Sequence, residues 1–107
     1  MRTLSCHILD TSKGTPAAGI SISLYDTTTP TPQAQQLTDC DGRVRFEEIE
    51  LSQGQYTLVF DTNNYCKQQF GEAFFPEVRV TFCVNDDRHY HIPLLLSPYS
   101  YSTYRGS

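Results

Sequence analysis

The feature that most constrains the fold of this chain is an alternation of apolar and other side chains with a period of two residues. Every second residue is apolar in the segments 20–25, 56–61 and 77–84. Successive side chains of a strand point to opposite faces of a sheet, so this pattern places one face of each segment in a core. Turn signals such as Asp41-Gly42 separate the segments. Several short strands at this spacing predict an all-β sandwich or barrel.

Length and composition bound the organisation of the chain. Its 107 residues predict one domain, residues 1–107, which can bury a hydrophobic core without disulfide bonds. Residues 63–71 could form a short helix, with Asn63 or Asn64 as the N-cap and Gly71 at the end. The four cysteines lack the paired spacing of a zinc site, and no apolar leader precedes the first predicted strand, so we expect free thiols and a cytoplasmic location. The net charge of −4 argues against a nucleic-acid partner, and no apolar run is long enough to cross a membrane.

The same alternation places two histidines away from the core. His7 falls on the face of its strand opposite the apolar one, and His91 shares such an outward face with Pro93 and Leu95. Apolar side chains on an outward face should not remain bare in water, so we expect another layer or another subunit to cover them. Pro93 cannot donate to a sheet ladder, which predicts an edge strand, a bulge or a local bend there.

The pattern alone leaves several interpretations of these residues open. The histidines could be ordinary surface side chains, a metal-free polar site or a metal site. His7, His89 and His91 together would supply the three imidazoles of a catalytic zinc site, although nothing in the spacing brings His7 near the other two. Arg43 could be a surface residue beside a turn. The nearly uncharged tail at 99–107 could be disordered, or it could be a strand that lies against a partner.

The C-terminal run is far more specific than any spacing rule. The segment from His89 to Ser107 closely resembles the end of the 5-hydroxyisourate hydrolases, also called transthyretin-related proteins, whose signature is a terminal Tyr-Arg-Gly-Ser. Other stretches resemble the family's opening, its second hairpin and the start of its sixth strand: residues 7–10 with 14–19, residues 38–43 and residues 74–78. The resemblance covers essentially the whole chain.

This resemblance implies a fold, an assembly and a reaction. The implied fold is a transthyretin-like sandwich of two four-stranded sheets, about eight strands in all, with one short helix. The implied assembly is a homotetramer, a dimer of dimers, with active sites where the dimers meet. The implied reaction hydrolyses the cyclic amide of 5-hydroxyisourate to 2-oxo-4-hydroxy-4-carboxy-5-ureidoimidazoline, during the degradation of urate to allantoin. Neither a metal nor an organic cofactor is implied.

The family's catalytic residues map onto His7, Arg43, His91 and Ser107. Imidazoles can activate water and protonate the leaving nitrogen, although which histidine does which stays open. A guanidinium can bind the substrate, stabilise a developing oxyanion and keep a nearby histidine neutral. Ser107 would offer a hydroxyl and a terminal carboxylate to orient the water or a histidine. The family's His-x-Pro pattern favours His91 over His89.

Further residues complete the expected site and separate the enzyme from its main rival. His7 and Arg43 are expected to bind substrate, together with Tyr104, Arg105 and Gly106, which shape the pocket. The rival is a transthyretin-like carrier of a small aromatic ligand. Transthyretin lacks the second imidazole and the terminal Tyr-Arg-Gly-Ser, and the bulk of Tyr104 should obstruct a central channel. The resemblance therefore favours the enzyme.

Overall fold

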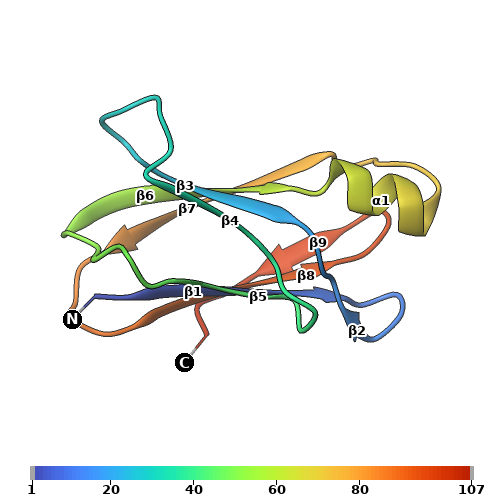
Figure 1. The fold of residues 1–107 in the computed structure, drawn as a ribbon, viewed down its shortest axis with the longest axis horizontal. Helices are drawn as coiled ribbons and strands as arrows, with labels where there is room; N and C mark the ends of the chain where they lie inside the picture. The colour runs from blue at the N-terminus through green and yellow to red at the C-terminus, as the bar shows by residue number, and fades with distance from the viewer. Residues whose placement is uncertain (1, 107) are drawn as a thin grey trace.

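The alternating segments form strands in two facing sheets. In the computed structural model, which describes residues 2–106, the two sheets form a sandwich with one short helix at its edge (Figure 1). The first sheet contains β1 (Leu4–Asp10), β2 (Thr15–Pro16), β5 (Arg43–Phe46), β8 (Tyr90–Leu96) and β9 (Tyr101–Thr103). The second contains β3 (Ser21–Asp26), β4 (Ala34–Leu37), β6 (Gly54–Asp61) and β7 (Glu77–Val84). The predicted all-β sandwich is confirmed, and the two-residue β2 makes the first sheet five-stranded.

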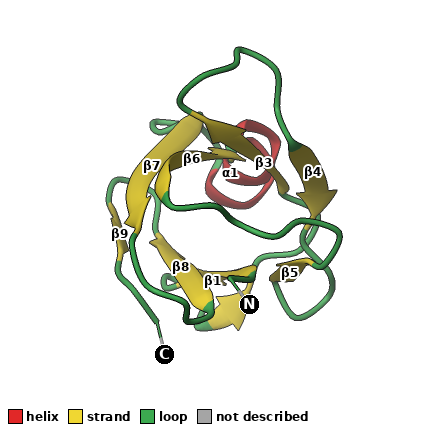
Figure 2. Cartoon of the chain, turned by 90° about the vertical axis from the view of Figure 1, so that its left-hand side faces the viewer, coloured by secondary structure: helices red, strands yellow, loops and turns green. Residues whose placement is uncertain are grey.

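The first sheet is arranged around β1. This strand pairs in parallel with β8 along its whole length, and antiparallel with β5 and β2 at its two ends. Strand β9 lies on the far side of β8, and the second sheet follows the order β4-β3-β6-β7. Figure 2 shows the two sheets facing each other, with α1 (Asn63–Phe70) beside the second. This order brings the two ends of the chain together, because β1 and β8 are neighbours.

The core confirms the predicted parity of the strands. Strands β1 and β8 bury one face against the second sheet, and the inward side chains of β6 and β7 pack against them. Cys6 lies in this core, and all four cysteines are free thiols. The largest fully buried side chains are Tyr90, Phe46, Phe60, Leu4, Ile8, Ile20, Ile22, Leu24, Leu51, Leu58, Leu94 and Leu96.

The helix lies where the sequence predicts it, but its first turn differs. Gly71 ends the helix with a left-handed φ of 87°, and its N–H donates to the carbonyl of Lys67. The predicted cap at Asn63 or Asn64 is wrong, because the N-cap is Thr62 and the N–H of Cys66 donates to its carbonyl. The Thr62 hydroxyl does not cap the helix and instead donates to the carbonyl of Phe75. Among the described residues, no helix is long and apolar enough to span a membrane.

Pro93 lies in a central strand and not at an edge, so that part of the sequence prediction is wrong. Strand β8 runs between β1 and β9, and its pairing with β1 continues through Pro93. Pairing with β9 covers Leu94 to Leu96 and stops there, and only an isolated bridge between His91 and Gly106 continues it. Proline has no N–H to donate toward β9, and its carbonyl accepts instead from the Thr103 hydroxyl. After β9, the tail therefore does not continue regular strand pairing with β8.

Candidate active site

Three strands of the first sheet bring the predicted catalytic side chains to one outward face. In the pairing of β1 with β5, His7 lies directly opposite Arg43. In the pairing of β1 with β8, Ser5 lies opposite His91, so that His91 is diagonal to His7. Residues opposite or diagonal on one sheet face have Cβ atoms roughly 5–8 Å apart. The structure therefore places His7, Arg43 and His91 together on the same face.

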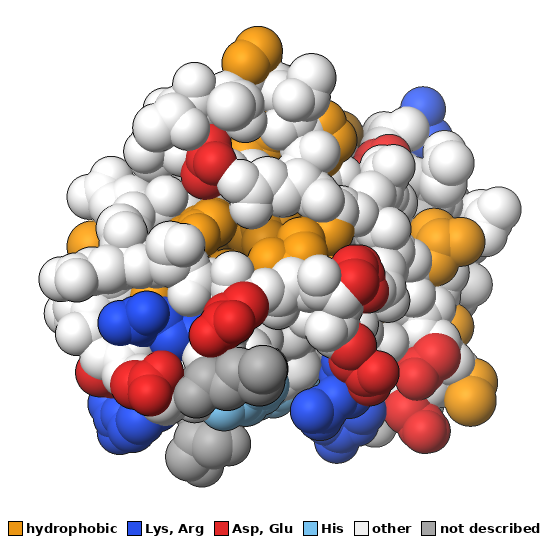
Figure 3. Space-filling view, turned by 60° about the vertical axis from the view of Figure 1, so that its left-hand side comes forward, with side chains coloured by type: hydrophobic (Ala, Val, Ile, Leu, Met, Phe, Trp, Pro, Cys, Tyr) orange, Lys and Arg blue, Asp and Glu red, His pale blue; other side chains and the backbone are white. Residues whose placement is uncertain are grey.

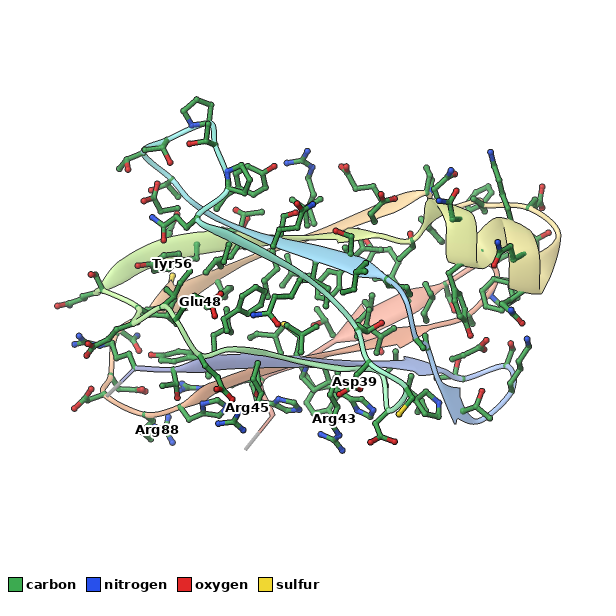
Figure 4. The ribbon with its side chains drawn as sticks, viewed as in Figure 1. Asp39, Arg43, Arg45, Glu48, Tyr56 and Arg88 are labelled. Carbon is green, nitrogen blue, oxygen red and sulfur yellow. The ribbon has the colours of Figure 1, made fainter. Side chains whose placement is uncertain are left out.

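The guanidinium of Arg43 is available for a ligand. Arg43 is the first residue of β5 and directly follows the Asp39–Gly42 turn. In this turn the Asp39 carboxylate accepts a hydrogen bond from the Arg43 backbone N–H at 3.0 Å. Figure 4 shows the Arg43 and Arg45 side chains pointing away from the sandwich on its outer side. Arg45 forms an ion pair with Glu47 at 3.5 Å, whereas the Arg43 side chain has no such partner among residues 2–106. In Figure 3, histidine side chains lie between two groups of basic side chains on this surface.

Gly42 holds the turn that delivers Arg43. Its φ of 73° lies in the left-handed region, and its carbonyl accepts from the Ile8 N–H at 2.8 Å. A Cβ at this position would lie 2.5 Å from the carbonyl oxygen of Ile8, a contact that ordinary side chains cannot make. The Asp-Gly sequence therefore sets the position of β5 against β1, and with it the position of Arg43 opposite His7.

The ring of His91 is fixed from two directions. Its Nδ1 atom lies 2.7 Å from the Ser5 hydroxyl oxygen. On the other side, the backbone N–H of Gly106 donates to the His91 carbonyl at 2.7 Å, so the tail packs against the ring. A Cβ at Gly106 would lie 2.5 Å from His91 Cδ2. These contacts leave the Nε2 atom without a hydrogen-bond partner among the described residues.

The tail reaches this position because Arg105 is held at the edge of the sheet. Its guanidinium donates to both carboxylate oxygens of Asp86, at 3.1 and 3.2 Å, and lies 4.1 Å above the ring centroid of Tyr90. These contacts, with a further ion pair from Arg88, hold the pKa of the Asp86 carboxyl well below its usual range. Arg105 therefore faces Asp86 and not the histidines, and it places Gly106 beside His91.

Two predicted site residues remain, Tyr104 and Ser107. The side chain of Tyr104 is 56% exposed. Ser107 lies outside the described residues, so its predicted role stays a prediction. Two residues that the sequence analysis missed contribute to the site, Ser5 and Asp86. Strand alternation could have placed Ser5 on the face of His7, but nothing in the sequence shows that it lies opposite His91.

The environment of His91 favours its neutral form. Burial of the ring lowers the pKa of His91 below its ordinary value of 6.5, and repulsion from Arg43, His89 and His7 lowers it further. A hydrogen bond with the backbone of Ser5 acts in the opposite direction and raises this pKa. A histidine that is neutral at physiological pH can accept a proton from water. The predicted effect of a nearby guanidinium on a histidine is thus found for Arg43 and His91.

The arrangement of His89 bears on the three-histidine metal site. Both of its ring nitrogens are engaged, Nδ1 with Thr3 and Nε2 with Ser5. Within residues 2–106, no group of three or more His, Cys, Asp or Glu side chains is arranged to hold a metal ion. His89 is therefore committed to hydrogen bonds in this structure.

A groove lies between β5 and β4, and no histidine is among the residues that line it. Its volume is about 480 Å³, within the range of small-molecule sites, and its lining includes Ser5, Arg43 and Arg45. Gln36 and Leu37 of β4 close the opposite side, and Glu47 and Glu48 line one end. Arg43 therefore lies between the groove and His7.

We expect that replacing Gly106 with alanine displaces the His91 ring. The new methyl group would overlap Cδ2, and the ring cannot move freely because Ser5 holds its Nδ1 atom. Displacing a reacting group by about 1 Å costs on the order of tenfold to a hundredfold in rate. Steady-state kinetics should show the loss in kcat, while Gly71→Ala, which removes a helix-end glycine far from the site, should change stability more than kcat. Wild-type kcat in the Gly106→Ala protein would contradict the close packing.

The two arginines of β5 should act on different histidines. We expect Arg43→Gln to raise the pKa of His91 toward 6.5, because it removes a repulsive positive charge. Arg45→Gln is the matched control, since burial and Arg45 together lower the pKa of His89, whereas Arg43 is the guanidinium that lowers the pKa of His91. Titration of the imidazole signals by NMR would measure both values. An unchanged pKa of His91 in Arg43→Gln, or an equal shift of this pKa in Arg45→Gln, would contradict this geometry.

Comparisons with known proteins agree with the fold and with the sequence resemblance. The model of the HIUase/Transthyretin family matches residues 4–106. The chain is 42% identical to a probable 5-hydroxyisourate hydrolase of Schizosaccharomyces pombe, over 97% of this chain and 90% of that protein. It is 40% identical to the mouse 5-hydroxyisourate hydrolase, over 97% of this chain and 94% of the mouse protein.

Solved structures lead to the same family. The structure of Klebsiella pneumoniae 5-hydroxyisourate hydrolase superposes with a TM-score of 0.89 at 38% identity, over 100% of both chains. Sea bream transthyretin in complex with thyroxine superposes with a TM-score of 0.86 at 33% identity, over 96% of this chain and 93% of that one. A family model that covers nearly the whole chain, and relatives of this similarity, establish that the chain belongs to the HIUase/Transthyretin family.

Proposed function

We propose that this protein is a 5-hydroxyisourate hydrolase, which opens the cyclic amide of 5-hydroxyisourate. Relatives that carry this name match it at about 40% identity over nearly its full length. The observation that carries the proposal is the gathering of two imidazoles and a guanidinium, from three strands, on one face of the sheet. The product would be 2-oxo-4-hydroxy-4-carboxy-5-ureidoimidazoline, on the route from urate to allantoin.

The proposed catalytic residues are His7, Arg43, His91 and Ser107. Amide hydrolysis needs an activated water, stabilisation of the tetrahedral oxyanion and a proton for the leaving nitrogen. One imidazole accepts a proton from water while the other protonates the leaving nitrogen. The guanidinium of Arg43 donates hydrogen bonds to the substrate carbonyl and stabilises its negative charge during attack. Ser107 orients the water or a histidine through its hydroxyl or its carboxylate.

The tail has a supporting part in this proposal. Tyr104 and Gly106 line the substrate pocket, and Gly106 also keeps His91 in place. The structure ties the Arg105 side chain to Asp86, which supports a role in positioning the tail. No metal or organic cofactor takes part in the proposed reaction, because water, two imidazoles and a guanidinium can supply all three requirements.

We also propose that the protein works as a homotetramer, a dimer of dimers, with its sites where the dimers meet. Leu9 and Leu95 lie on the outward face and are only half-buried within one chain, so a second subunit would cover them. Strands β7 and β9 end their sheets within the described chain and present edges that another copy could extend. Light scattering in solution should report the mass of a tetramer. The four free thiols suit a reducing cytoplasm, where we place the protein.

The direct test is the absorbance decay of freshly prepared 5-hydroxyisourate. Purified protein should accelerate the decay at catalytic concentrations, and prior treatment with a chelator should not change the rate. Equal decay with and without protein would reject the proposal. A thyroxine carrier, the alternative suggested by the likeness to sea bream transthyretin, would bind an aromatic ligand stoichiometrically and show no turnover.

A further inference from the structure

A chain of hydrogen-bonded side chains connects the Nδ1 side of His91 to the solvent. Ser5 Oγ lies 2.7 Å from His91 Nδ1 and 2.8 Å from His89 Nε2. We propose that Ser5 and His89 are positioning residues that hold the His91 ring and carry protons between its Nδ1 atom and solvent. This role rests on the proposed function, because it gives His91 the protonation state that it needs as either the base or the acid of the hydrolysis.

The sheet builds this chain from segments at opposite ends of the sequence. Ser5 and His91 are 86 residues apart and become partners through the parallel pairing of β1 with β8. His89 precedes β8 by one residue and lies two residues before His91, so the two rings project to the same side of the backbone. The Tyr90 N–H donates to the Thr3 carbonyl at 2.8 Å, which ties the start of β8 to β1. The Thr3 hydroxyl lies 2.5 Å from His89 Nδ1 and completes the chain.

The Ser5 hydroxyl has a single proton, so it donates to one imidazole and accepts from the other. In the first arrangement, Thr3 donates to His89 Nδ1, His89 Nε2–H donates to Ser5, and Ser5 donates to His91 Nδ1. His91 then carries its proton on Nε2 and can protonate the leaving nitrogen. In the second arrangement every bond is reversed, and His91 presents a bare Nε2 that can accept a proton from water.

The two arrangements interconvert with balanced protons. When Nε2 takes a proton from water, the Nδ1 proton passes to Ser5, the Ser5 proton passes to His89 Nε2, and His89 Nδ1–H passes its proton to Thr3, which releases one to solvent. When Nε2 protonates the leaving nitrogen, each transfer runs in the opposite direction and solvent supplies the proton. His91 is neutral at the end of each step.

The charges around His91 disfavour its protonated form, and the relay avoids this form. An imidazolium at His91 would lie in a partly buried position near the Arg43 guanidinium and the His7 ring, which both oppose it. Passing the second proton to Ser5 and His89 moves the charge away from Arg43. His89 is exposed, so water can solvate the charge and remove the proton. Arg45 is the charged group that opposes protonation of His89.

The experiment compares Ser5→Ala, which cuts the relay, with Ser5→Thr, which keeps the hydroxyl. Outer partners of a functional imidazole typically contribute about tenfold or more to activity. We expect Ser5→Ala to lower kcat about tenfold with little change in KM, and Ser5→Thr to restore most of the rate. Thr57→Ala is a matched control, because it removes a hydroxyl that is bonded to Thr81 at 2.8 Å on the other sheet.

The pH profile separates the relay from simple disturbance of the site. A hydrogen bond with the Ser5 backbone raises the pKa of His91 and is kept in Ser5→Ala, so loss of the hydroxyl alone should leave the acid limb of the kcat profile near its wild-type position. If the variant only loosened the His91 ring, the ring would become more exposed. Its pKa would then rise toward 6.5, and the acid limb of the kcat profile would move to higher pH. A wild-type kcat in Ser5→Ala, or an upward shift of the limb, would overturn the relay. Absence of turnover in the wild-type protein would reject the hydrolase itself, so the two failures are distinguishable.

A second variant covers the case in which Ser5→Ala does not fold. His89→Ala changes an exposed side chain and removes the other partner of Ser5. The nitrogen chemical shifts of the His91 ring report which nitrogen carries the proton, and this measurement needs no substrate. We expect His89→Ala to change the balance between the two tautomers of His91. Unchanged nitrogen shifts at His91 would overturn the relay.

Discussion

Replacing His91 with alanine should lower kcat for 5-hydroxyisourate by a factor of about 10² to 10⁴, the usual contribution of a general acid or base. The reason is that its Nε2 atom has no hydrogen-bond partner among residues 2–106 and that its ring lies near His7 and Arg43, held by Ser5 and packed against Gly106. Initial rates of absorbance decay would measure the loss. The fold should survive, because the His91 side chain lies on the outward face and contributes nothing to the core.

His89→Ala is the control for this prediction. It removes an imidazole from the same strand segment but leaves His91 in the site, so its effect on kcat should be clearly smaller. His7→Ala should resemble His91→Ala, because both histidines are proposed to transfer protons. An His91→Ala protein that keeps its rate, or an His89→Ala protein that loses more, would show that the imidazoles have been assigned wrongly.

Replacing Arg43 with alanine is expected to cost about 10² to 10³ in kcat, the scale of losing a donor to a developing oxyanion. The guanidinium is the positive charge that lies opposite His7 in the strand register, and within residues 2–106 no carboxylate forms an ion pair with it. Because it acts mainly in the transition state, the loss should appear in kcat more than in KM. The same absorbance assay, run over a range of substrate concentrations, separates the two.

Arg45→Ala tests whether charge alone explains the effect of Arg43. Arg45 is two residues further along β5, points outward in the same way and is paired with Glu47. It opposes Ser5 and not His7 in the register of β1 and β5. We expect Arg45→Ala to change kcat only slightly. Equal losses in the two variants would mean that the positive potential of β5, and not a contact from Arg43, supports the reaction.

Much of the fold could be predicted from the sequence because alternation depends only on strand geometry. Strand β7 has the predicted limits, residues 77–84, and the outward positions of His7 and His91 follow from parity alone. Gly71 ends the helix as predicted, since a left-handed residue at a helix end favours glycine. Local chemistry was therefore sufficient for these elements.

What could not be predicted depends on pairing between distant segments. Nothing in the sequence places Ser5 opposite His91 or brings Asp86 to Arg105, because both contacts follow from β1 and β8 being neighbours and from the path of the tail. Because Pro93 lacks an N–H, the sequence predicts an edge strand, a bulge or a local bend there. The sheet accommodates it centrally, since pairing with β9 is interrupted there and the Thr103 hydroxyl binds its carbonyl. The predicted helix cap, Asn63 or Asn64, is wrong for a similar reason: the helix begins after Thr62, whose hydroxyl is bonded to the Phe75 carbonyl across the loop.

A crystal structure with bound urate, the stable precursor of 5-hydroxyisourate, would locate the purine site directly. The account predicts the purine on the outward face of the five-stranded sheet, with its carbonyl edge on the Arg43 guanidinium and its ring within hydrogen-bonding distance of His7 and His91. Urate bound anywhere else, with these three side chains untouched, would contradict it.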